Sequence, residues 1–284
     1  MVKKVLIVGS GVMGVGIANL CAMSNYEVSI LTRSATDKEE VRKNIKRDSA
    51  YYKKGKSVSS NKDIDTFPEI EIITEYTAIS NADLIIECVL EDLDIKKDVI
   101  SRLSKYKKNS AIIATNTSSL SITELSLSTS DPDNFIGLHF FNPAKIMKLN
   151  EIILGLLTSD HCAVVVKDFS KSISKTPVVV NEAPGFIVNR LLIPMINEAI
   201  AILVEGVADK EDIDSAMKLG ANHPIGPLSL ADLIGNDVCL SILDILHKET
   251  GDQKYRAHPY LKKMVRGGKL GRKTGVGFYS YRGK

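Results

Sequence analysis

The sequence has no tryptophan, only 6% aromatic residues and only four cysteines in 284 residues. Cys21, Cys88, Cys162 and Cys239 lie far apart, form no CxxC pair and stand among apolar residues. Scattered cysteines in such surroundings are usually reduced thiols of a hydrophobic core, so the pattern argues against a disulfide framework and against a cysteine metal site. It favours a reducing compartment, and we expect the protein in the cytoplasm.

Long apolar runs are also missing, because no stretch approaches the roughly eighteen apolar residues that a membrane-spanning helix needs. The first residues, MVKKVLIVG, place two lysines before an apolar run, as a secretion signal does, but the run ends at Gly9 and a buried strand explains it better. The net charge is only +3, which calls for neither nucleic acid nor an anionic membrane as partner. An anionic small molecule stays possible.

The first part of the chain alternates short apolar runs with amphipathic stretches. The runs that indicate strands are KVLIVG (4–9), VSILT (28–32), EIIT (71–74), DLIIECV (83–89), AIIATN (111–116) and FIGLHF (135–140). This alternation is typical of a doubly wound, largely parallel sheet covered by helices, which is an α/β fold. The basic segment 46–63 indicates a helix end that continues into an exposed, solvated loop.

The pattern changes after residue 183. From Phe186 onward there is almost no strand signal, and the segment 187–206, IVNRLLIPMINEAIAILVEG, has helical spacing. We therefore predict two domains: a doubly wound domain over 1–183 and an all-α domain over 184–284, with the stretch Ala183-Pro184-Gly185 as the hinge between them.

A glycine-rich loop directly follows the first predicted strand. Gly9, Gly11 and Gly14 have the GxGxxG spacing, with Val12 and Met13 between the second and third glycine. The first glycine permits the tight turn, the second lets a pyrophosphate approach the backbone, and the third lets helix and strand pack closely. The loop predicts a Rossmann-type dinucleotide-binding domain that opens the chain.

The second predicted strand lacks the carboxylate that usually follows such a loop. An acidic residue about twenty positions further on generally binds the ribose hydroxyls of NAD. Here the strand ends in Leu31, Thr32 and Arg33, and no acidic residue stands between positions 29 and 36. The hydroxyls of Thr32 and Ser34 and the guanidinium of Arg33 suit a 2′-phosphate, so we predict a preference for NADP over NAD. If Arg33 points to solvent and Thr32 binds the ribose diol, both cofactors would be used.

A histidine and a glutamate are the candidate acid–base pair. His139 ends a strand at the edge where doubly wound sheets bind ligands, and Glu151 follows twelve residues later, after a turn and at the start of another strand. That spacing allows the carboxylate to return beside the imidazole and stabilise its charged form, as a general base requires. On this pattern alone a structural histidine is about as well supported.

Five long motifs carry a family resemblance over the whole chain. They are ATNTSSLSITE (114–124), GLHFFNPAKIMKLNEI (137–152), EAPGFIVNRLLIPMINEA (182–199), EDIDSAMKLGANHPIGPLSLADLIG (211–235) and GRKTGVGFYSY (271–281). Together they resemble the 3-hydroxyacyl-CoA dehydrogenase family, above all its short-chain 3-hydroxybutyryl-CoA members. The resemblance implies an oxidoreductase of fatty acid metabolism that interconverts (S)-3-hydroxyacyl-CoA and 3-oxoacyl-CoA with a nicotinamide cofactor. It also implies a homodimer through the helical domain.

The resemblance implies roles for single residues as well. His139 would be the catalytic acid and base, Glu151 its partner, and Ser118 and Asn189 would contact the 3-oxygen and thioester region of the substrate. The residues expected to touch the dinucleotide, beyond the glycine loop, Thr32 and Arg33, are Glu91, Lys96, Ser118, Asn142 and Lys273. Coenzyme A would be bound by Ser49 and Lys56, which makes segment 46–63 a binding segment.

Three positions depart from the family pattern. Thr32 stands where close relatives have aspartate, Asn150 where an apolar residue is usual, and Asp92 where asparagine is common. Two other functions stay open. One is a dehydrogenase of a free hydroxy acid or sugar acid, against which Ser49 and Lys56 argue. The other is a non-catalytic dinucleotide-binding relative, against which the complete set of His139, Glu151, Ser118 and Asn189 argues.

Overall fold

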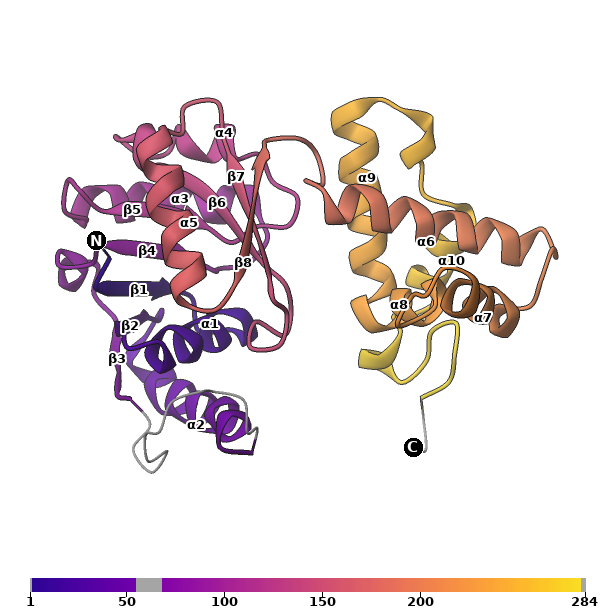
Figure 1. Ribbon diagram of the computed structural model, residues 1–284, viewed down its shortest axis with the longest axis horizontal. Helices are drawn as coiled ribbons and strands as arrows, with labels where there is room; N and C mark the ends of the chain where they lie inside the picture. Colours follow the sequence, from indigo (N-terminus) through magenta and orange to yellow (C-terminus); the bar gives the residue numbers. More distant parts are fainter. Residues whose placement is uncertain (1, 55–67, 282–284) are drawn as a thin grey trace. The chain divides into compact units, whose positions relative to one another are not determined.

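The computed structural model describes residues 2–54 and 68–281, so the predicted coenzyme A contact of Lys56 lies outside the described residues. The chain divides into two compact units, Met1–Ala183 and Pro184–Lys284. Figure 1 shows the strands of the first unit in indigo to pink, and the helices of the second in orange to yellow.

The first unit contains one eight-stranded sheet in the order β3-β2-β1-β4-β5-β6-β7-β8. Its strands are β1 (Lys4–Val8), β2 (Glu27–Leu31), β3 (Ile70–Ile73), β4 (Leu84–Glu87), β5 (Ile112–Thr115), β6 (Phe135–Phe140), β7 (Leu149–Leu154) and β8 (Thr176–Asn181). Neighbouring strands are parallel except β6 and β7, which are antiparallel. The predicted largely parallel, doubly wound sheet is therefore confirmed. The strand order reverses direction between β1 and β4, which is the place where such folds bind ligands.

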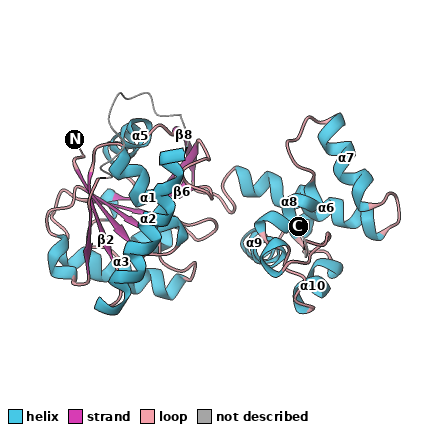
Figure 2. Cartoon of the chain, turned by 90° about the horizontal axis from the view of Figure 1, so that it is seen from below, coloured by secondary structure: helices cyan, strands magenta, loops and turns pink. Residues whose placement is uncertain are grey.

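Helices pack around this sheet, as Figure 2 shows. They are α1 (Val12–Met23), α2 (Lys38–Lys54), α3 (Leu93–Tyr106), α4 (Ile122–Ser126) and α5 (Asp160–Ser172), with short 3₁₀ turns η1 (Ala35–Asp37), η2 (Tyr76–Ile79) and η3 (Pro132–Asn134). Helix α1 carries apolar residues on nearly every side, and it is accordingly buried from Gly14 to Ala22. It packs against β1 and β2, and so holds the glycine loop at the carboxyl ends of the strands.

The second unit is helical, as predicted. It contains α6 (Val188–Val204), α7 (Lys210–Gly220), α8 (Pro227–Ile234), α9 (Asn236–Thr250) and α10 (Pro259–Arg266), with 3₁₀ turns η4 (Gln253–Tyr255) and η5 (Arg272–Thr274). Its core is built from apolar residues at helical spacing, such as Ile193, Ile196 and Ile200 of α6. The buried Asp232 carboxylate accepts hydrogen bonds from the backbone N–H groups of Phe278 and Tyr279, both at 2.9 Å, which ties the C-terminal segment to α8.

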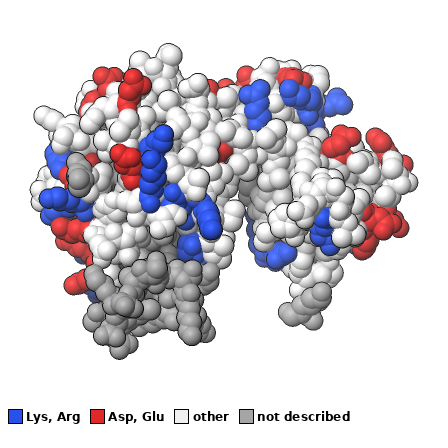
Figure 3. Space-filling model, viewed as in Figure 1, with Lys and Arg blue, Asp and Glu red and all other residues white. Residues whose placement is uncertain are grey.

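The expected absence of disulfides agrees with the structure, in which all four cysteines are free. Burial raises the pKa of Cys162 and of Cys239 to about 12, so both are unreactive thiols at neutral pH. Within residues 2–54 and 68–281, no helix has both the length and the apolar character that crossing a bilayer requires. On the face drawn in Figure 3, both signs of charge occur on each unit, which agrees with the small net charge.

Asp83 fixes the edge of the sheet opposite the glycine loop. Its carboxylate accepts the backbone N–H groups of Lys3 at 2.7 Å and Lys4 at 2.9 Å, and pairs with the ammonium group of Lys108. Burial alone would raise the pKa of this carboxyl, but the hydrogen bonds from Lys108, Lys4 and Lys3 outweigh it and lower the pKa to about 2. The ionised form therefore stabilises the folded state.

Asp83→Asn is expected to lower the free energy of unfolding by about 1 kcal/mol at pH 7, after allowance for screening by water. A carboxyl whose pKa is lowered by folding contributes its stability above its ordinary pKa near 4, and loses it as the pH falls toward 2. Urea unfolding at pH 7 and pH 3 should therefore give a smaller difference between variant and wild type at pH 3. Glu71→Gln, on an exposed position of β3, is the control, and a pH-independent difference for Asp83→Asn would contradict the assignment.

Candidate active site

The glycine loop has the shape that its spacing predicts. Gly9 has a φ of +109°, and a Cβ built there would lie 2.8 Å from the carbonyl oxygen of Cys88. A Cβ on Gly14 would lie 2.0 Å from the carbonyl oxygen of Gly9, so helix α1 can approach the loop only with glycine at this position. At Gly11, by contrast, no heavy atom lies within 4 Å of the Cβ position. The backbone is thus tight behind the loop and open in front of it.

The N-terminus of α1 faces this open space without a cap of its own. Gly11 is the N-cap residue, no side chain caps the helix, and its first turn holds no acidic residue. Val12 is 76% exposed, while Met13 packs against the core. Free N–H groups and the positive end of the helix dipole are suited to an anion. The loop therefore fits the pyrophosphate of a dinucleotide.

His139 and Glu151 lie directly opposite each other on the antiparallel strands β6 and β7. Residues in that register project to the same face, and the imidazole Nδ1 is 2.8 Å from Oε2 of Glu151. Glu151 is fully buried and His139 is 4% exposed. The buried carboxylate at Nδ1 fixes the orientation of the ring, so the pair is placed to accept and release a proton through Nε2.

Ser118 lies on the other side of the imidazole. Its hydroxyl is 3.1 Å from Nε2 of His139, and its backbone N–H donates to Glu91 at 2.7 Å. Glu91 also accepts the Thr117 hydroxyl at 2.6 Å, which fixes the loop after β5. The structure thus brings together His139, Glu151, Ser118 and Glu91, four of the residues predicted from the sequence.

Lys96 is fully buried and belongs to a polar cluster under this loop. Its ammonium group lies 2.9 and 3.0 Å from the carboxylate oxygens of Glu87, 3.1 Å from the carbonyl oxygen of Asn116, and 3.7 Å from Glu91. Glu87, also fully buried, accepts the Thr115 hydroxyl at 2.6 Å. The sequence reasoning missed Glu87, although a glutamate at the end of the apolar run DLIIE is a detectable signal.

At the end of β2, Thr32 is buried and Arg33 is exposed. The Thr32 hydroxyl lies 3.3 Å from the hydroxyl of Ser10, in the glycine loop, and 3.5 Å from Oδ2 of Asp37. Asp37 was not among the predicted site residues, because it stands five positions past the strand end. The turn η1 returns it to Thr32.

Four predicted residues have other surroundings. Asn142 is exposed in the loop after β6, and Ser49 is buried in α2 with its hydroxyl donating to the carbonyl of Lys46 at 2.8 Å. In the second unit, Asn189 is 9% exposed in the first turn of α6. Lys273 pairs with Asp237 at 2.6 Å.

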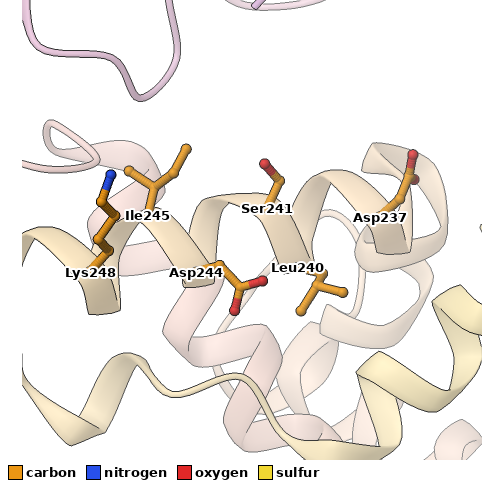
Figure 4. Close-up of a pocket in the computed structure, with 6 residues that line it drawn as sticks. All are labelled: Asp237, Leu240, Ser241, Asp244, Ile245 and Lys248. Atoms are coloured by element: carbon orange, nitrogen blue, oxygen red, sulfur yellow. The ribbon is translucent and has the colours of Figure 1, made fainter. Parts of the chain in front are cut away.

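Asp237 begins a row of side chains on α9 that line a shallow pocket. Figure 4 shows Asp237, Ser241, Ile245 and Lys248 on one side of the helix, at spacings of three and four residues. The pocket is confined to the second unit, and His139 does not line it.

Two of the departures from the family pattern have local structural explanations. Asp92 is the N-cap residue of α3, where its carboxylate accepts the N–H of Ile95 at 3.0 Å. Asn150 is fully buried beside the pair, and its amide donates to the carbonyl of His139 at 3.4 Å.

Comparison with known families decides the classification. The NAD-binding domain of 3-hydroxyacyl-CoA dehydrogenase matches residues 4–183, and the C-terminal domain of the same enzyme matches residues 185–281. The chain belongs to the 3-hydroxyacyl-CoA dehydrogenase family. The resemblance seen in the five motifs is thereby confirmed, and the nicotinamide-binding character of the first unit follows from it.

Individual members of the 3-hydroxyacyl-CoA dehydrogenase family match almost the full chain. It is 51% identical over 282 residues to a 3-hydroxybutyryl-CoA dehydrogenase of Clostridioides difficile, covering 98% of this chain and 99% of the relative. It is 39% identical to the human mitochondrial hydroxyacyl-coenzyme A dehydrogenase, covering 99% and 92%. The crystal structure of (S)-3-hydroxybutyryl-CoA dehydrogenase from Ralstonia eutropha matches this chain with a TM-score of 0.94 and a sequence identity of 42%. The match covers 99% of each chain.

Mutation can distinguish a role of Lys96 in stabilising the fold from a role in binding the dinucleotide. Lys96→Met leaves the Glu87 carboxylate buried without its cation, which is expected to cost about 3–5 kcal/mol of folding free energy. The double variant Glu87→Gln, Lys96→Met should recover a large part of that loss, as measured by urea unfolding. Lys97→Met, which removes a half-exposed lysine next to it in sequence, is the control. A stable Lys96→Met protein that has lost only dinucleotide affinity would instead assign Lys96 to cofactor binding.

Proposed function

We propose that the protein is a dehydrogenase that interconverts (S)-3-hydroxyacyl-CoA and 3-oxoacyl-CoA, with 3-hydroxybutyryl-CoA and acetoacetyl-CoA as the preferred pair. The observation that carries the proposal is the geometry of His139, whose Nδ1 contacts Glu151 at 2.8 Å and whose Nε2 is at 3.1 Å from Ser118. The similarity to the 3-hydroxybutyryl-CoA dehydrogenases of Clostridioides difficile and Ralstonia eutropha supports the same substrate pair.

In the oxidative direction, Nε2 of His139 accepts the proton of the 3-hydroxyl group while the hydride leaves C3 of the substrate. A bound nicotinamide nucleotide supplies the acceptor of that hydride. In reduction, the imidazolium returns the proton to the oxygen that develops negative charge. The Glu151 carboxylate contacts Nδ1 at 2.8 Å, and this charge-assisted hydrogen bond stabilises the imidazolium that forms during the reaction.

Ser118 and Asn189 are neutral groups, suited to orient the substrate oxygens without competing for the proton. Ser118 is already fixed by Glu91 through its backbone N–H. Asn189 belongs to the second unit, and we propose that this helical domain contributes it to the substrate's 3-oxygen and thioester region. Asn142 and Lys273, together with Glu91, are proposed to contact the dinucleotide.

The coenzyme A portion of the substrate is proposed to bind along α2 and the basic segment after it. Ser49 and Lys56 are the residues that the family pattern assigns to it. A lysine that reaches a phosphate of coenzyme A suits this substrate and would not serve a free hydroxy acid.

The second unit is also proposed to form a dimer through α6, whose Leu191 is 71% exposed and Val204 48% exposed. We also propose a cytoplasmic location, which suits four unpaired thiols.

We also propose that the protein prefers NADP(H) to NAD(H), because of Thr32 and Arg33 at the end of β2. The Arg33 side chain is exposed at the end of β2 and can pair with a 2′-phosphate through two parallel hydrogen bonds. Thr32 replaces the carboxylate that would repel that phosphate.

His139→Gln is expected to lower the turnover number by about 10²–10⁴-fold with little change in dinucleotide affinity, because glutamine cannot transfer the proton. Initial rates with acetoacetyl-CoA and fluorescence titration with the reduced cofactor measure the two quantities. Glu151→Gln should lower the rate and move the pH–rate profile toward lower pH, since an amide stabilises the imidazolium less. His161→Gln, on the surface of α5, serves as control. Retention of more than a tenth of the rate in His139→Gln would mean that the proton takes another route.

The double variant Thr32→Asp, Arg33→Ile is expected to shift the ratio of kcat/KM for NADPH and NADH at least tenfold toward NADH. The reason is that a charge-assisted hydrogen bond, worth about 1.5–3 kcal/mol when sheltered, is lost and a repulsive carboxylate is gained. Arg42→Ile is the control for a general charge effect, because it removes an arginine of α2 that lies away from the end of β2. A ratio that does not move in the double variant would contradict the assignment of Arg33.

A further inference from the structure

The turn after β2 provides a carboxylate that the strand end itself lacks. Asp37 closes the turn η1, where its N–H donates to the carbonyl of Ser34 at 3.2 Å. The turn carries its Oδ2 to 3.5 Å from the Thr32 hydroxyl. An acidic group is therefore present at the end of β2 in space, although it is absent from positions 29–36 of the sequence.

We propose that Asp37 is a specificity-determining residue, which binds the adenosine ribose hydroxyls of NAD(H) and limits the affinity for NADP(H). This inference rests on the proposed function, since it requires a nicotinamide dinucleotide in the glycine loop. It goes beyond the proposal for Arg33, because it assigns the opposite effect to a second residue at the same strand end.

The contacts of Thr32 connect this carboxylate to the dinucleotide cradle. The same hydroxyl that lies near Asp37 is 3.3 Å from Ser10, which stands between the first two glycines of the loop. The backbone of Gly9 also donates to the carbonyl of Leu31 at 3.1 Å, which holds the loop against the end of β2. Ser10, Thr32 and Asp37 thus form one polar cluster at the position where this fold receives the ribose next to the adenine.

The chemistry of a carboxylate gives the direction of the effect. An ionised carboxylate only accepts hydrogen bonds, and a ribose hydroxyl can donate one. A 2′-phosphate removes that donor and adds up to two negative charges within a few ångströms of Asp37. The repulsion acts at a half-buried site, where it is screened less than between fully exposed charges.

Within residues 2–54 and 68–281, no ion pair includes Asp37, and Arg42 of α2 pairs with Glu39 at 2.8 Å. Arg33 is exposed at the same strand end and attracts the phosphate that Asp37 repels. The two residues together make both cofactors usable, and Asp37 sets how far the preference for NADP(H) can go.

The test is the direct measurement of the dissociation constants of NADH and NADPH by fluorescence titration at low salt. Asp37→Asn keeps the size of the side chain and removes its charge, so we expect NADPH to bind about tenfold tighter relative to NADH. The gain should shrink at 0.5 M salt, because screening weakens the repulsion that was removed. Glu40→Gln removes the same charge three residues further on, at an exposed position of α2, and should change the ratio by less than about twofold.

Asp37→Ser provides a second variant that keeps a hydroxyl near Thr32 without a charge, and it should give the same direction. An unchanged NADPH-to-NADH ratio in both variants, with dinucleotide binding intact, would overturn the role of Asp37 and leave the proposed function standing. A wild-type protein that binds neither dinucleotide would overturn the proposed function itself, and this inference with it.

Discussion

The buried ion pair of Glu87 and Lys96 is the interaction on which the site depends. Glu87 ends β4, accepts the hydroxyl of Thr115 at the end of β5, and holds the ammonium group of Lys96 from α3. Two parallel strands and a helix are thereby fixed at one edge of the sheet. Since two buried charges are stable only when their hydrogen bonds are satisfied, this edge tolerates little displacement.

The loop that leaves β5 transmits this rigidity to the proton-transferring histidine. Lys96 holds the carbonyl of Asn116 at 3.1 Å, and the side-chain oxygen of Asn116 accepts the N–H of Phe140, the residue after His139. Ser118 follows two residues later and meets the imidazole. The topology explains why these groups meet: β1, β4, β5 and β6 run parallel, so their carboxyl ends share one edge with the glycine loop.

Much of this arrangement could be predicted from the sequence because it follows from periodicity and short spacings. The six apolar runs predicted β1 to β6, whereas β8 was not predicted as a strand. The twelve residues from His139 to Glu151 allowed a return of the chain, and the antiparallel pair of β6 and β7 makes that return. Asp37 and Glu87 could not be placed in the same way. The position of Asp37 depends on a 3₁₀ turn that folds back on Thr32, and the partner of Glu87 lies in a helix that follows its strand. Neither contact has a periodic signal, and burial of Lys96 contradicts the usual exposure of lysine.

The register of β6 and β7 also separates what can vary in this site from what cannot. His139 and Glu151 meet because they are cross-strand partners, so their contact is set by the two strands and not by the connection over residues 141–148. An insertion in that connection would leave the partners opposite each other. A one-residue deletion within either strand would move Asn150 or Ile152 into the place of Glu151 and turn the carboxylate to the other face of the sheet. The contact between His139 and Glu151 therefore depends on the length of the two strands and not on the length of the loop that joins them.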